Sequence, residues 1–591
     1  MRLKAKQDRC SITVAVCDLI DPDNEVRLID TFVEKLDIVS HGFNYKTAKE
    51  GIDLGGPSEY DPKDLLRIYI YGYLNRVRSS RLLEKVCKKN IEVIWLLGNL
   101  SPSHNTINEF RRCHPLALFL VFQTFNTFWQ ELGLFIEDSP LEDSPLEDPD
   151  SITYATDGSR FAAQNSKANN YNLEKIEANL SRYDKKAIAY LKELSELEDG
   201  LASPSLELKP DGDGLNDLEK TTTELASNES EELEQLVKEV ESNESNQPEE
   251  VETAKAVILE KLKHIHKGKQ RNLMLKEALV KGGETQISLT DADARRLTKN
   301  KTSIVGYNVQ ISTEATHKLI AHFQVVNKGD IHLFAQMGEP TAEFLTAQDK
   351  SIKVNGLGDK GYDNGEDIYK CEQMGITTYI SPSRNFNTQK PIGFRKENFQ
   401  YDLETDTYLC PQNQVLTRTG NLYKKRAGRV KDYRAKTADC LACPFKEKCL
   451  SKSSLEKPLG RVIRRTEFED AKDANRERVS NNKELYGKRK AIVEHPFGTI
   501  KRQWGYDYTL LKGFAKVTGE FALIFSVYNL RRAITELGVN AIIDKLNEQE
   551  SLVFSNFSPK LLIGVILRPL IGFFEWLTTG LVKAHGYLLL E

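Results

Sequence analysis

The sequence predicts a mixed α/β domain preceded by a helical region, and three observations support this prediction. Segments rich in β-branched and aromatic residues, typical of strands, occur at 151–163, 306–326 and 351–365. Apolar residues at helical spacing occupy intervening segments such as 330–348. Before any strand pattern appears, residues 61–98 also show this helical spacing. Helices and strands that alternate along the chain are typical of α/β folds.

The first part of the chain, residues 1–136, is expected to be a helical domain that binds DNA. Basic residues are frequent along 61–98, and Ser101 or Ser103 could cap a short helix in 100–112 that ends in two arginines. Short helices joined by a tight turn suit a helix-turn-helix-like reader of the major groove. Packing within a helical bundle explains the apolar positions equally well, so both interpretations stay open.

Charge is distributed unevenly along the chain. An acidic, proline-containing linker at 137–150 holds seven acidic residues and no base, and residues 196–250 hold 18 acidic and three basic residues. The whole chain has a formal net charge of −4, so the other 522 residues carry a net charge of +18. A basic folded part is what a DNA partner requires.

The α/β domain is expected over 151–545, with two inserts. Residues 165–290 begin and end as charged helix around an acidic, low-complexity middle that we expect to be disordered. Residues 385–470 form a second insert that holds most of the clustered cysteines. Between the inserts, 306–326 is typical of a β-hairpin, and 375–382 is a strand that a proline ends.

No pattern in the sequence favours export or membrane insertion. The first residues lack the apolar core of a signal peptide, and nine cysteines, several of them clustered, suit a reducing cytosol, so we expect a cytoplasmic protein. The tail 546–591 contains an apolar run, 561–582, but Arg568, Pro569 and Glu575 interrupt it. A packing helix without membrane contact is therefore expected there.

Two aspartates are predicted at the ends of strands, where side chains of an α/β sheet gather at one edge. Asp157 and Asp359 each follow an apolar strand and come before a glycine. Asp363 and Asp367 are competitors, ranked lower because they lie past the strand end. A single Asp near a glycine is usually only a turn, but with Glu494 there are three acids, which would repel each other without a divalent cation. Two Mg²⁺ (or Mn²⁺) ions on these three carboxylates could promote phosphodiester cleavage.

Glu494 lies in the basic segment "RKAIVEHPFGTIKRQWG" (489–505). Pro496 predicts a kink or a helix start nearby. Trp504 could stack on an unpaired base or, in the alternative that we favour, be buried. The bases expected to bind phosphates are Arg489, Lys490, Lys501 and Arg502.

Four cysteines have spacing that could form a structural zinc site, namely Cys410, Cys440, Cys443 and Cys449. The alternative is four reduced thiols in a loop. The spacing is not that of a common zinc finger, so the sequence leaves both alternatives open.

Three blocks of the sequence resemble the catalytic blocks of bacterial insertion-sequence transposases of the DDE class. These blocks are "TDGSRFAAQNSK", "LGDKGYDNGEDI" and "VEHPFGTIKRQWGYDYTLLKGFAK", and "YDPKDLLRIYIYGYLNRVRSSRLLE" resembles the N-terminal helical domain of the same family. The resemblance implies an RNase H-like mixed sheet flanked by helices. It also implies that Asp157, Asp359 and Glu494 are the catalytic, metal-binding acids.

The family pattern around the glutamate, Y-x2-R-x3-E-x6-K, is matched with one departure. Tyr486, Arg489, Glu494 and Lys501 fit it, but four residues separate the arginine from the glutamate. Either Arg489 or Lys490 could therefore fill the basic position.

The resemblance implies a DNA transposase that binds the terminal inverted repeats of its element. It would cleave the ends and join them to target DNA, acting as a homodimer on double-stranded DNA. Two alternatives are a metal-dependent endonuclease of the same fold that does not join strands, and a domesticated DNA-binding protein without catalysis.

Overall fold

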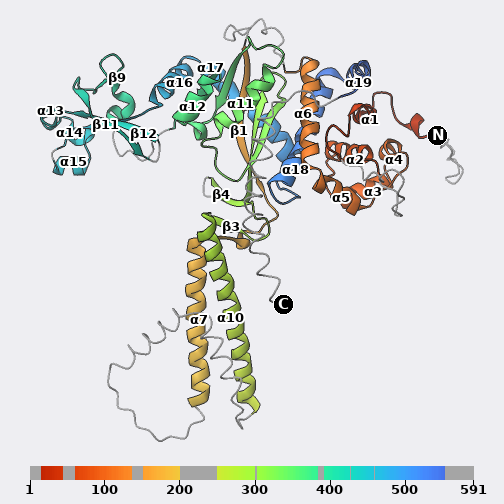
Figure 1. Ribbon diagram of the computed structural model, residues 1–591, viewed down its shortest axis with the longest axis horizontal. Coiled ribbons are helices and arrows are strands. Elements are labelled where there is room, and N and C mark those ends of the chain that lie inside the picture. Colours follow the sequence, from red (N-terminus) through yellow and green to blue (C-terminus); the bar gives the residue numbers. More distant parts are fainter. Residues whose placement is uncertain are drawn as a thin grey trace, which may run out of the picture. The chain divides into compact units, whose positions relative to one another are not determined.

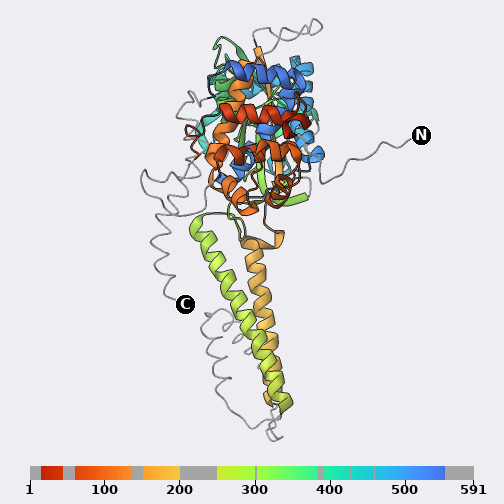
Figure 2. The ribbon, with the colours of Figure 1, turned by 90° about the vertical axis from the view of Figure 1, so that its right-hand side faces the viewer.

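The computed structural model describes most of the chain, in two compact units (Figures 1 and 2). One unit comprises Met1–Phe161 with Tyr307–Glu591, and the other comprises Ala162–Gly306. The described residues are 15–43, 60–135, 151–199, 249–299, 302–383, 392–425, 428–457 and 459–552. The predicted linker, the acidic middle of the first insert at 200–248 and the apolar tail from residue 553 lie outside these ranges.

A mixed sheet forms the centre of the first unit and confirms the predicted α/β class. Its strands follow the order β6-β5-β1-β7-β8. The strands β1, β7 and β8 are parallel, whereas β5 and β6 form the antiparallel hairpin that the sequence predicts. The bounds are β1 (Ser151–Ala162), β5 (Thr302–Glu314), β6 (Ile320–Val326), β7 (Lys353–Gly358) and β8 (Ile376–Ile380).

Strand β1 is longer than the sequence predicts. Asp157 was expected to end it, but the strand continues to Ala162. Residues 151–156 are buried, and burial decreases from Asp157 onward because the neighbouring strand β7 ends at Gly358. Strand β5 still pairs on the other side, so the backbone remains extended.

Helices cover both faces of the sheet. Successive side chains of a strand point to opposite faces, so Tyr154 and Ala155 of β1 contact different helices. The ring of Tyr154 stacks on Phe334 of α11 (Phe334–Leu345). Ala155 packs with Ile492 and Val493 of α17 (Lys483–Phe497). Helices α12 (Gly365–Gln373) and α16 (Glu469–Asn481) contact β8.

The N-terminal helices pack on the long helix α18 (Phe514–Leu537), and Figure 1 shows α6 and α18 side by side. The side chain of Ser103 accepts a hydrogen bond from the Thr106 amide and caps α5, as the sequence predicts. The helices are α1 (Glu25–Lys35), α2 (Pro62–Leu74), α3 (Ser80–Cys87), α4 (Ile91–Leu96), α5 (His104–Cys113) and α6 (Pro115–Glu131), and α19 (Val539–Glu548) packs on α1.

A buried asparagine joins α6, α18 and the edge strand β6. The Asn529 amide donates to Asn126 Oδ1 at 2.8 Å and to the Ile320 carbonyl at 2.9 Å. Its oxygen accepts from the Ile320 amide at 2.9 Å. Because a buried amide is costly unless it is paired, this network favours one register between the helices and the sheet.

The second unit contains a hairpin of two long antiparallel helices, α7 (Leu173–Asp199) and α10 (Glu249–Gly282), which run side by side in Figures 1 and 2. They pack through the apolar residues Ala187, Leu194, Ile258, Leu262 and Ile265. Near the base of the hairpin, β2 (Asn170–Asn172) pairs with β3 (Gln286–Ser288), and β4 (Arg295–Lys299) pairs with the start of β5. Within the described ranges, no helix has the length and apolar character needed to cross a membrane.

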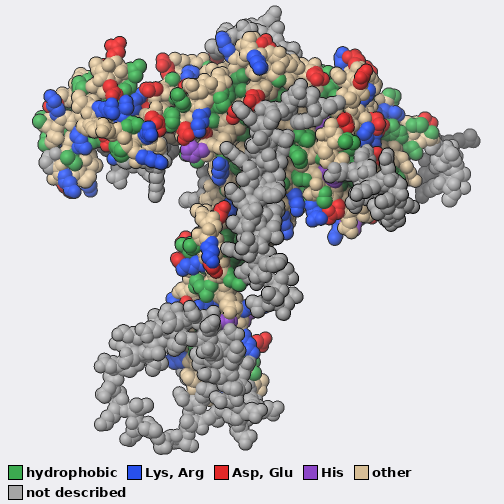
Figure 3. Space-filling model, in the orientation of Figure 1, with side chains coloured by type: hydrophobic (Ala, Val, Ile, Leu, Met, Phe, Trp, Pro, Cys, Tyr) green, Lys and Arg blue, Asp and Glu red, His purple; other side chains and the backbone are tan. Residues whose placement is uncertain are grey.

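The second insert folds into a small domain of residues 392–466, which we name the cysteine module. It contains an antiparallel sheet of order β13-β12-β11-β10-β9 and three short helices, and Figure 3 shows lysine and arginine side chains over its visible face. The strands are β9 (Gln400–Asp402), β10 (Thr407–Leu409), β11 (Val415–Lys425), β12 (Gly428–Ala435) and β13 (Val462–Thr466). The helices are α13 (Thr437–Ala442), α14 (Lys446–Cys449) and α15 (Lys452–Glu456).

A buried ion pair connects the N-terminal helices to α18. Arg78 lies 3.5 Å from Glu520, and both side chains are almost inaccessible to solvent, at 6% and 0% exposure. Arg78 also donates to the Tyr508 carbonyl at 2.9 Å and lies 4.2 Å from the ring of Tyr506. This arginine was counted in the sequence among the bases of a DNA-binding surface, but its position makes it part of the core.

We predict that Arg78→Ala destabilises the protein by about 3–5 kcal/mol, because it leaves the buried Glu520 carboxylate without its cation. The matched control is Arg81→Ala, which removes an exposed arginine from α3. Thermal unfolding of the full chain would show a clear drop in midpoint for the first variant and almost none for the second. Equal midpoints for the two variants would contradict a structural role for Arg78.

Candidate active site

The structure brings Asp157 and Asp359 together through the parallel pairing of β1 with β7. In this register Thr156 lies opposite Gly358, so Asp157 and Asp359 are the next residues after this pair, where adjacent strands are about 4.7–4.9 Å apart. Each carboxylate accepts a nearby backbone amide: Asp157 from Gly158 at 2.8 Å, and Asp359 from Gly361 at 2.6 Å. The expectation that both side chains lie at one sheet edge therefore agrees with the geometry.

A third aspartate, which the sequence analysis missed, lies beside this pair. Asp330 Oδ1 accepts hydrogen bonds from the amides of Asn308 at 2.8 Å and Gln310 at 2.9 Å. A Cβ atom built on Gly361 would lie 2.8 Å from Asp359 Oδ1 and 3.3 Å from Asp330 Oδ2, so both carboxylates surround one point.

The sequence did contain a signal for Asp330. The polar residues Asn308, Gln310 and Ser312 alternate with apolar residues along β5 and are all buried. Buried amides need partners, so a polar stripe on a buried strand predicts a polar group opposite it. Only the folded chain shows which group this is.

Tyr362 completes the polar network. It is fully buried, and its hydroxyl donates to Gln310 Oε1, which leaves the Gln310 amide nitrogen to face Asp330. Burial raises the Tyr362 pKa far above its usual value, and the charges of Asp330, Asp157 and Asp359 raise it further. The hydroxyl therefore stays protonated and remains a hydrogen-bond donor.

Arg489 faces the aspartates. Its guanidinium lies 3.9 Å from Asp157 Oδ2, and its side chain is 17% exposed. It is four residues after Leu485 and four before Val493, both of which pack on the sheet, so all three share one face of α17. Lys490 instead points to solvent at 72% exposure. Of the two bases that the spacing left open, only Arg489 contacts an aspartate.

Glu494 is not gathered with the aspartates. Its side chain is 65% exposed, and it pairs with Lys490 at 3.7 Å. In the parts of the chain that the structure describes, no three or more His, Cys, Asp or Glu side chains lie close enough together to hold a metal ion. The helix runs through Pro496 and becomes a π-helical turn at Gly498–Gln503, so its geometry changes just after the expected kink.

Lys501 contacts β1 just beyond Asp157. Its ammonium donates to Ser159 Oγ at 2.9 Å and to the Arg160 carbonyl, and it lies 4.3 Å from the centre of the Phe161 ring. Burial lowers its pKa to about 8. Arg489 and Lys501, on either side of Glu494 in the sequence, thus both contact β1 near Asp157, which places the Glu494 segment across this strand.

The remaining residues selected from the sequence occupy different settings. Arg502 is exposed, whereas Trp504 is only 9% exposed and packs on Tyr506 and Tyr528, in agreement with the burial alternative. Asp363 accepts the Ser383 amide and pairs with Lys472 at 3.0 Å, and the buried Asp367 accepts the Phe334 amide. Both competitors of Asp359 therefore already have structural partners.

Two of the bases of the N-terminal region, besides Arg78, are also structural. Arg67 forms ion pairs with Asp30, Glu34 and Asp64, and Arg111 donates to the buried Tyr73 hydroxyl. The exposed bases of the described part of this region include Arg76, Arg81, Lys85, Lys88, Lys89 and Arg112.

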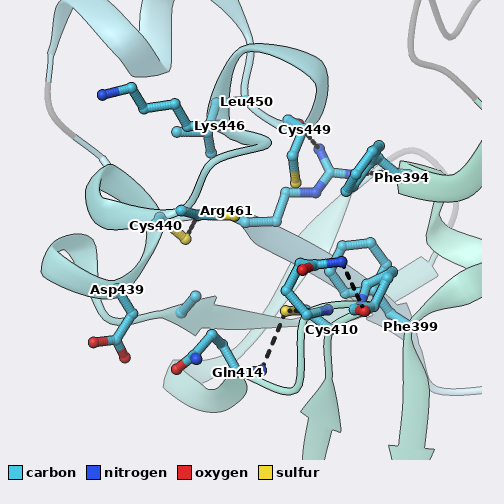
Figure 4. Close-up of a pocket in the computed structure, with 14 residues that line it drawn as sticks. Phe394, Phe399, Cys410, Gln414, Asp439, Cys440, Lys446, Cys449, Leu450 and Arg461 are labelled. Atoms are coloured by element: carbon cyan, nitrogen blue, oxygen red, sulfur yellow. Dashed lines mark hydrogen bonds between the residues drawn. The ribbon is translucent and has the colours of Figure 1, made fainter.

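The four clustered cysteines line a single cavity in the cysteine module, together with Arg461 and Phe399 (Figure 4). None of these four described cysteines forms a disulfide bond. The predicted proximity of the four cysteines is therefore confirmed. In the described residues, their sulfurs are not arranged closely enough to count as a metal-binding group.

Two segments of the chain match known families. Residues 15–113 match the family described as Transposase domain (DUF772), and residues 409–534 match the family described as Transposase DDE domain. These two matches indicate an insertion-sequence transposase of the DDE class. The second match includes the cysteine module, Arg489, Glu494 and Lys501, whereas Asp157 and Asp359 precede it. No curated protein and no solved structure matches the chain.

The crowded setting of Gly158 leads to a prediction about this transposase. A Cβ atom at this position would lie 2.1 Å from Gln310 Nε2 and 2.7 Å from Asp330 Oδ1. We expect Gly158→Ala to destabilise the chain by about 1–3 kcal/mol, because the polar network must shift to make room.

Gly487→Ala in α17 is the matched control, since nothing lies within 4 Å of its added Cβ atom. It should stabilise the helix by about 0.5–1 kcal/mol. Thermal unfolding of the two variants should therefore shift the midpoint in opposite directions, and a neutral Gly158→Ala would show that the network is not tightly packed.

Proposed function

We propose that the chain binds the ends of its own mobile element and catalyses metal-dependent DNA cleavage and strand transfer. Asp157, Asp359 and Glu494 are the three catalytic acids of this proposal. The observation that carries it is the β1–β7 register, which makes Asp157 and Asp359 neighbours in a chain of the DDE transposase family. The order of the central strands in the sequence (third, second, first, fourth, fifth) supports an RNase H-like domain.

The carboxylates at the sheet edge have the donor chemistry that divalent cations favour, although the described residues do not bring three of them within reach of one ion. Asp157, Asp359 and Asp330 supply carboxylate oxygens, and Mg²⁺ or Mn²⁺ favours a few carboxylates together with water and phosphate oxygens. In our proposal Asp157, Asp359 and Glu494 hold two such ions, and Asp330 adds a further carboxylate. When bound, these ions activate the attacking oxygen and stabilise the leaving oxygen.

Glu494 has the freedom that this role requires. In the described parts of the chain its side chain pairs only with Lys490, and both side chains are exposed. Arg489 before it and Lys501 after it both contact β1, so the segment that carries Glu494 crosses this strand. A turn of this side chain toward the sheet edge, or a small movement of α17 when DNA binds, would bring the third acid to the two aspartates.

The bases of this segment would hold the DNA backbone. Lys490 and Arg502 are exposed and able to contact phosphates, whereas Arg489 and Lys501 border Asp157 and would position the phosphate that is cleaved.

In the proposed reaction, water attacks the phosphorus at the end of the element, the bond to the 3′ oxygen breaks, and the released oxygen takes up a proton. The freed 3′ hydroxyl then loses its proton, attacks a target phosphodiester and displaces the 3′ oxygen of the target strand. Because two element ends must be joined together, we propose that the chain acts as a homodimer on DNA.

The proposal is tested with labelled element ends, a plasmid target and Mg²⁺ or Mn²⁺. We expect joined products from the wild type and a loss of at least about 100-fold in Asp157→Ala, Asp359→Ala and Glu494→Ala, because each removes an acid that acts in the transition state. Asp330→Asn should reduce the yield about 10–100-fold, as expected for a supporting carboxylate.

Glu484→Ala is the control, since it removes an exposed acid from the same helix as Glu494. Linear fragments without joined product would favour an endonuclease, and DNA binding without cleavage would favour a non-catalytic protein. Full activity in any variant of the three acids would remove that residue from the site.

The lowered pKa of Lys501 predicts a pH dependence of DNA binding. Burial lowers this pKa from 10.5 to about 8, so the charge that would contact phosphate is lost as the pH rises through 8. We expect the affinity for end DNA to fall between about pH 7 and pH 9, and the slope of log affinity against log salt to decrease by about 1. Fluorescence anisotropy with labelled ends at constant ionic strength measures both quantities.

Lys501→Arg should remove most of this pH dependence, because arginine stays charged. Lys490→Arg, on the exposed side of α17, is the control. The free energy of unfolding should change in the opposite sense. The pKa of Lys501 is lower in the folded than in the unfolded chain, so the folded state loses this proton first as the pH rises. The contribution of Lys501 therefore makes the folded state more stable as the pH rises from about 8 to about 10. An unchanged pH profile in Lys501→Arg would show that Lys501 does not contact the DNA.

A further inference from the structure

Four cysteines from separate segments of the cysteine module converge on one cavity (Figure 4). Cys410 follows β10, Cys440 lies in α13, Cys443 follows this helix, and Cys449 ends α14. The cavity has a volume of about 30 Å³, which is room for a water molecule or an ion. Convergence of all four thiols, which are up to 39 positions apart in the sequence, is the first indication of a shared ligand.

The sulfurs are hydrogen-bond acceptors. Cys410 Sγ accepts from the amides of Gln412 and Gln414, each at 3.3 Å, and Cys440 Sγ accepts from the Arg461 amide at 3.4 Å. These contacts fix two of the four sulfurs at the wall of the cavity. The thiolate is the form of cysteine that binds metal ions.

Arg461 provides a second, independent indication. Its side chain lies in the same cavity, and its two terminal nitrogens reach only the carbonyl oxygens of Cys449 and Phe394, both at 3.5 Å. Its Nε has no hydrogen-bond partner, and its guanidinium lies 5.4 Å from the centre of the Phe399 ring. Asp439 lines the same cavity but forms no ion pair with Arg461 among the described residues. A largely buried cation without a counter-charge is costly. Four thiolates around Zn²⁺ carry a net charge of −2 and would supply the missing counter-charge.

The size of the module gives a third indication. The helices α13, α14 and α15 have six, four and five residues, which is too short for stable helices without tertiary support. A core of six buried residues lies under them, and Cys410, Cys440 and Cys449 pack against it. A structural metal is one of the usual means of stabilising such a small domain.

We propose that Cys410, Cys440, Cys443 and Cys449 hold one structural Zn²⁺ ion in tetrahedral sulfur coordination. Thiolates select Zn²⁺ over Mg²⁺, so this site is separate from the carboxylate site. In the structure the four sulfurs line the cavity without forming a coordination group, so the proposal requires them to move closer together when the ion binds. Such coupling between metal binding and local folding is common in small zinc domains.

The site would fasten a basic surface to the catalytic chain. The exposed or half-exposed bases of the module include Arg418, Lys424, Arg429, Lys431, Arg434 and Lys446. Zinc holds the helices against the sheet that carries most of these side chains, so loss of the ion would disorder one end of the module and leave the aspartate pair in place.

The test measures zinc in the purified full chain, kept reduced and dialysed after incubation with Zn²⁺. Atomic emission should find about one zinc per chain in the wild type, and a loss of at least about 80% in the double variant Cys440→Ser/Cys443→Ser, because two of four ligands are removed. Cys113→Ser, which removes an exposed cysteine of α5, should keep its zinc. A wild type without zinc, or a double variant that retains it, would overturn the proposal.

A spectroscopic measurement keeps the test valid if the double variant does not fold. Cobalt(II) added to the metal-free wild type should give the sulfur-to-cobalt charge-transfer absorption and tetrahedral ligand-field bands, and absence of these bands would also overturn the proposal. Asp157→Ala should bind zinc like the wild type, so failure of the catalytic proposal and failure of the zinc proposal are distinguished.

Discussion

The parallel pairing of β1 with β7 is the constraint on which the rest of the site depends. It makes Asp157 and Asp359 neighbours although 202 positions separate them in the sequence. The same register directs Tyr154 toward α11 and Ala155 toward α17. Because side chains alternate between the faces of a strand, a slip of one residue would exchange the two faces and separate the acids from the helix that carries the bases.

The charge balance at the sheet edge explains its chemistry. Asp359 has Asp157 as its neighbour on the adjacent strand and Asp330 near its carboxylate, and the Arg489 guanidinium lies 3.9 Å from Asp157. The amide donors of Asn308 and Gln310 orient the Asp330 carboxylate. Negative charge held in place by neutral donors attracts cations, which is the property that a metal-dependent reaction on phosphate requires.

Two long inserts leave the central sheet and return to it, and the parallel pairing of β1 with β7 is kept. The cysteine module departs after β8 and returns through α16, where the Asn475 side chain forms two hydrogen bonds with the backbone of Ile380. This contact anchors the middle of α16 to β8, the strand from which the chain departed. The entropic cost of closing a long loop rises only slowly with its length, so such inserts are compatible with a stable core when both ends are fixed.

The sequence alone determined the local elements and the outline of the site. Period-two and helical patterns predicted the β-hairpin of β5 and β6, the helix capped by Ser103 and the mixed α/β class, because these depend on neighbouring residues. Two strand ends, each with an aspartate before a glycine, predicted the pair Asp157 and Asp359, since parallel strands end at a common edge.

Only the tertiary structure decided the features that depend on distant contacts. It buried Arg78 against Glu520, selected Arg489 as the base that faces Asp157, added Asp330 to the acids and left Glu494 exposed. A side chain's charge is visible in the sequence, but its partner is not. The partner is set by how helices pack on the sheet, and this packing joins residues hundreds of positions apart.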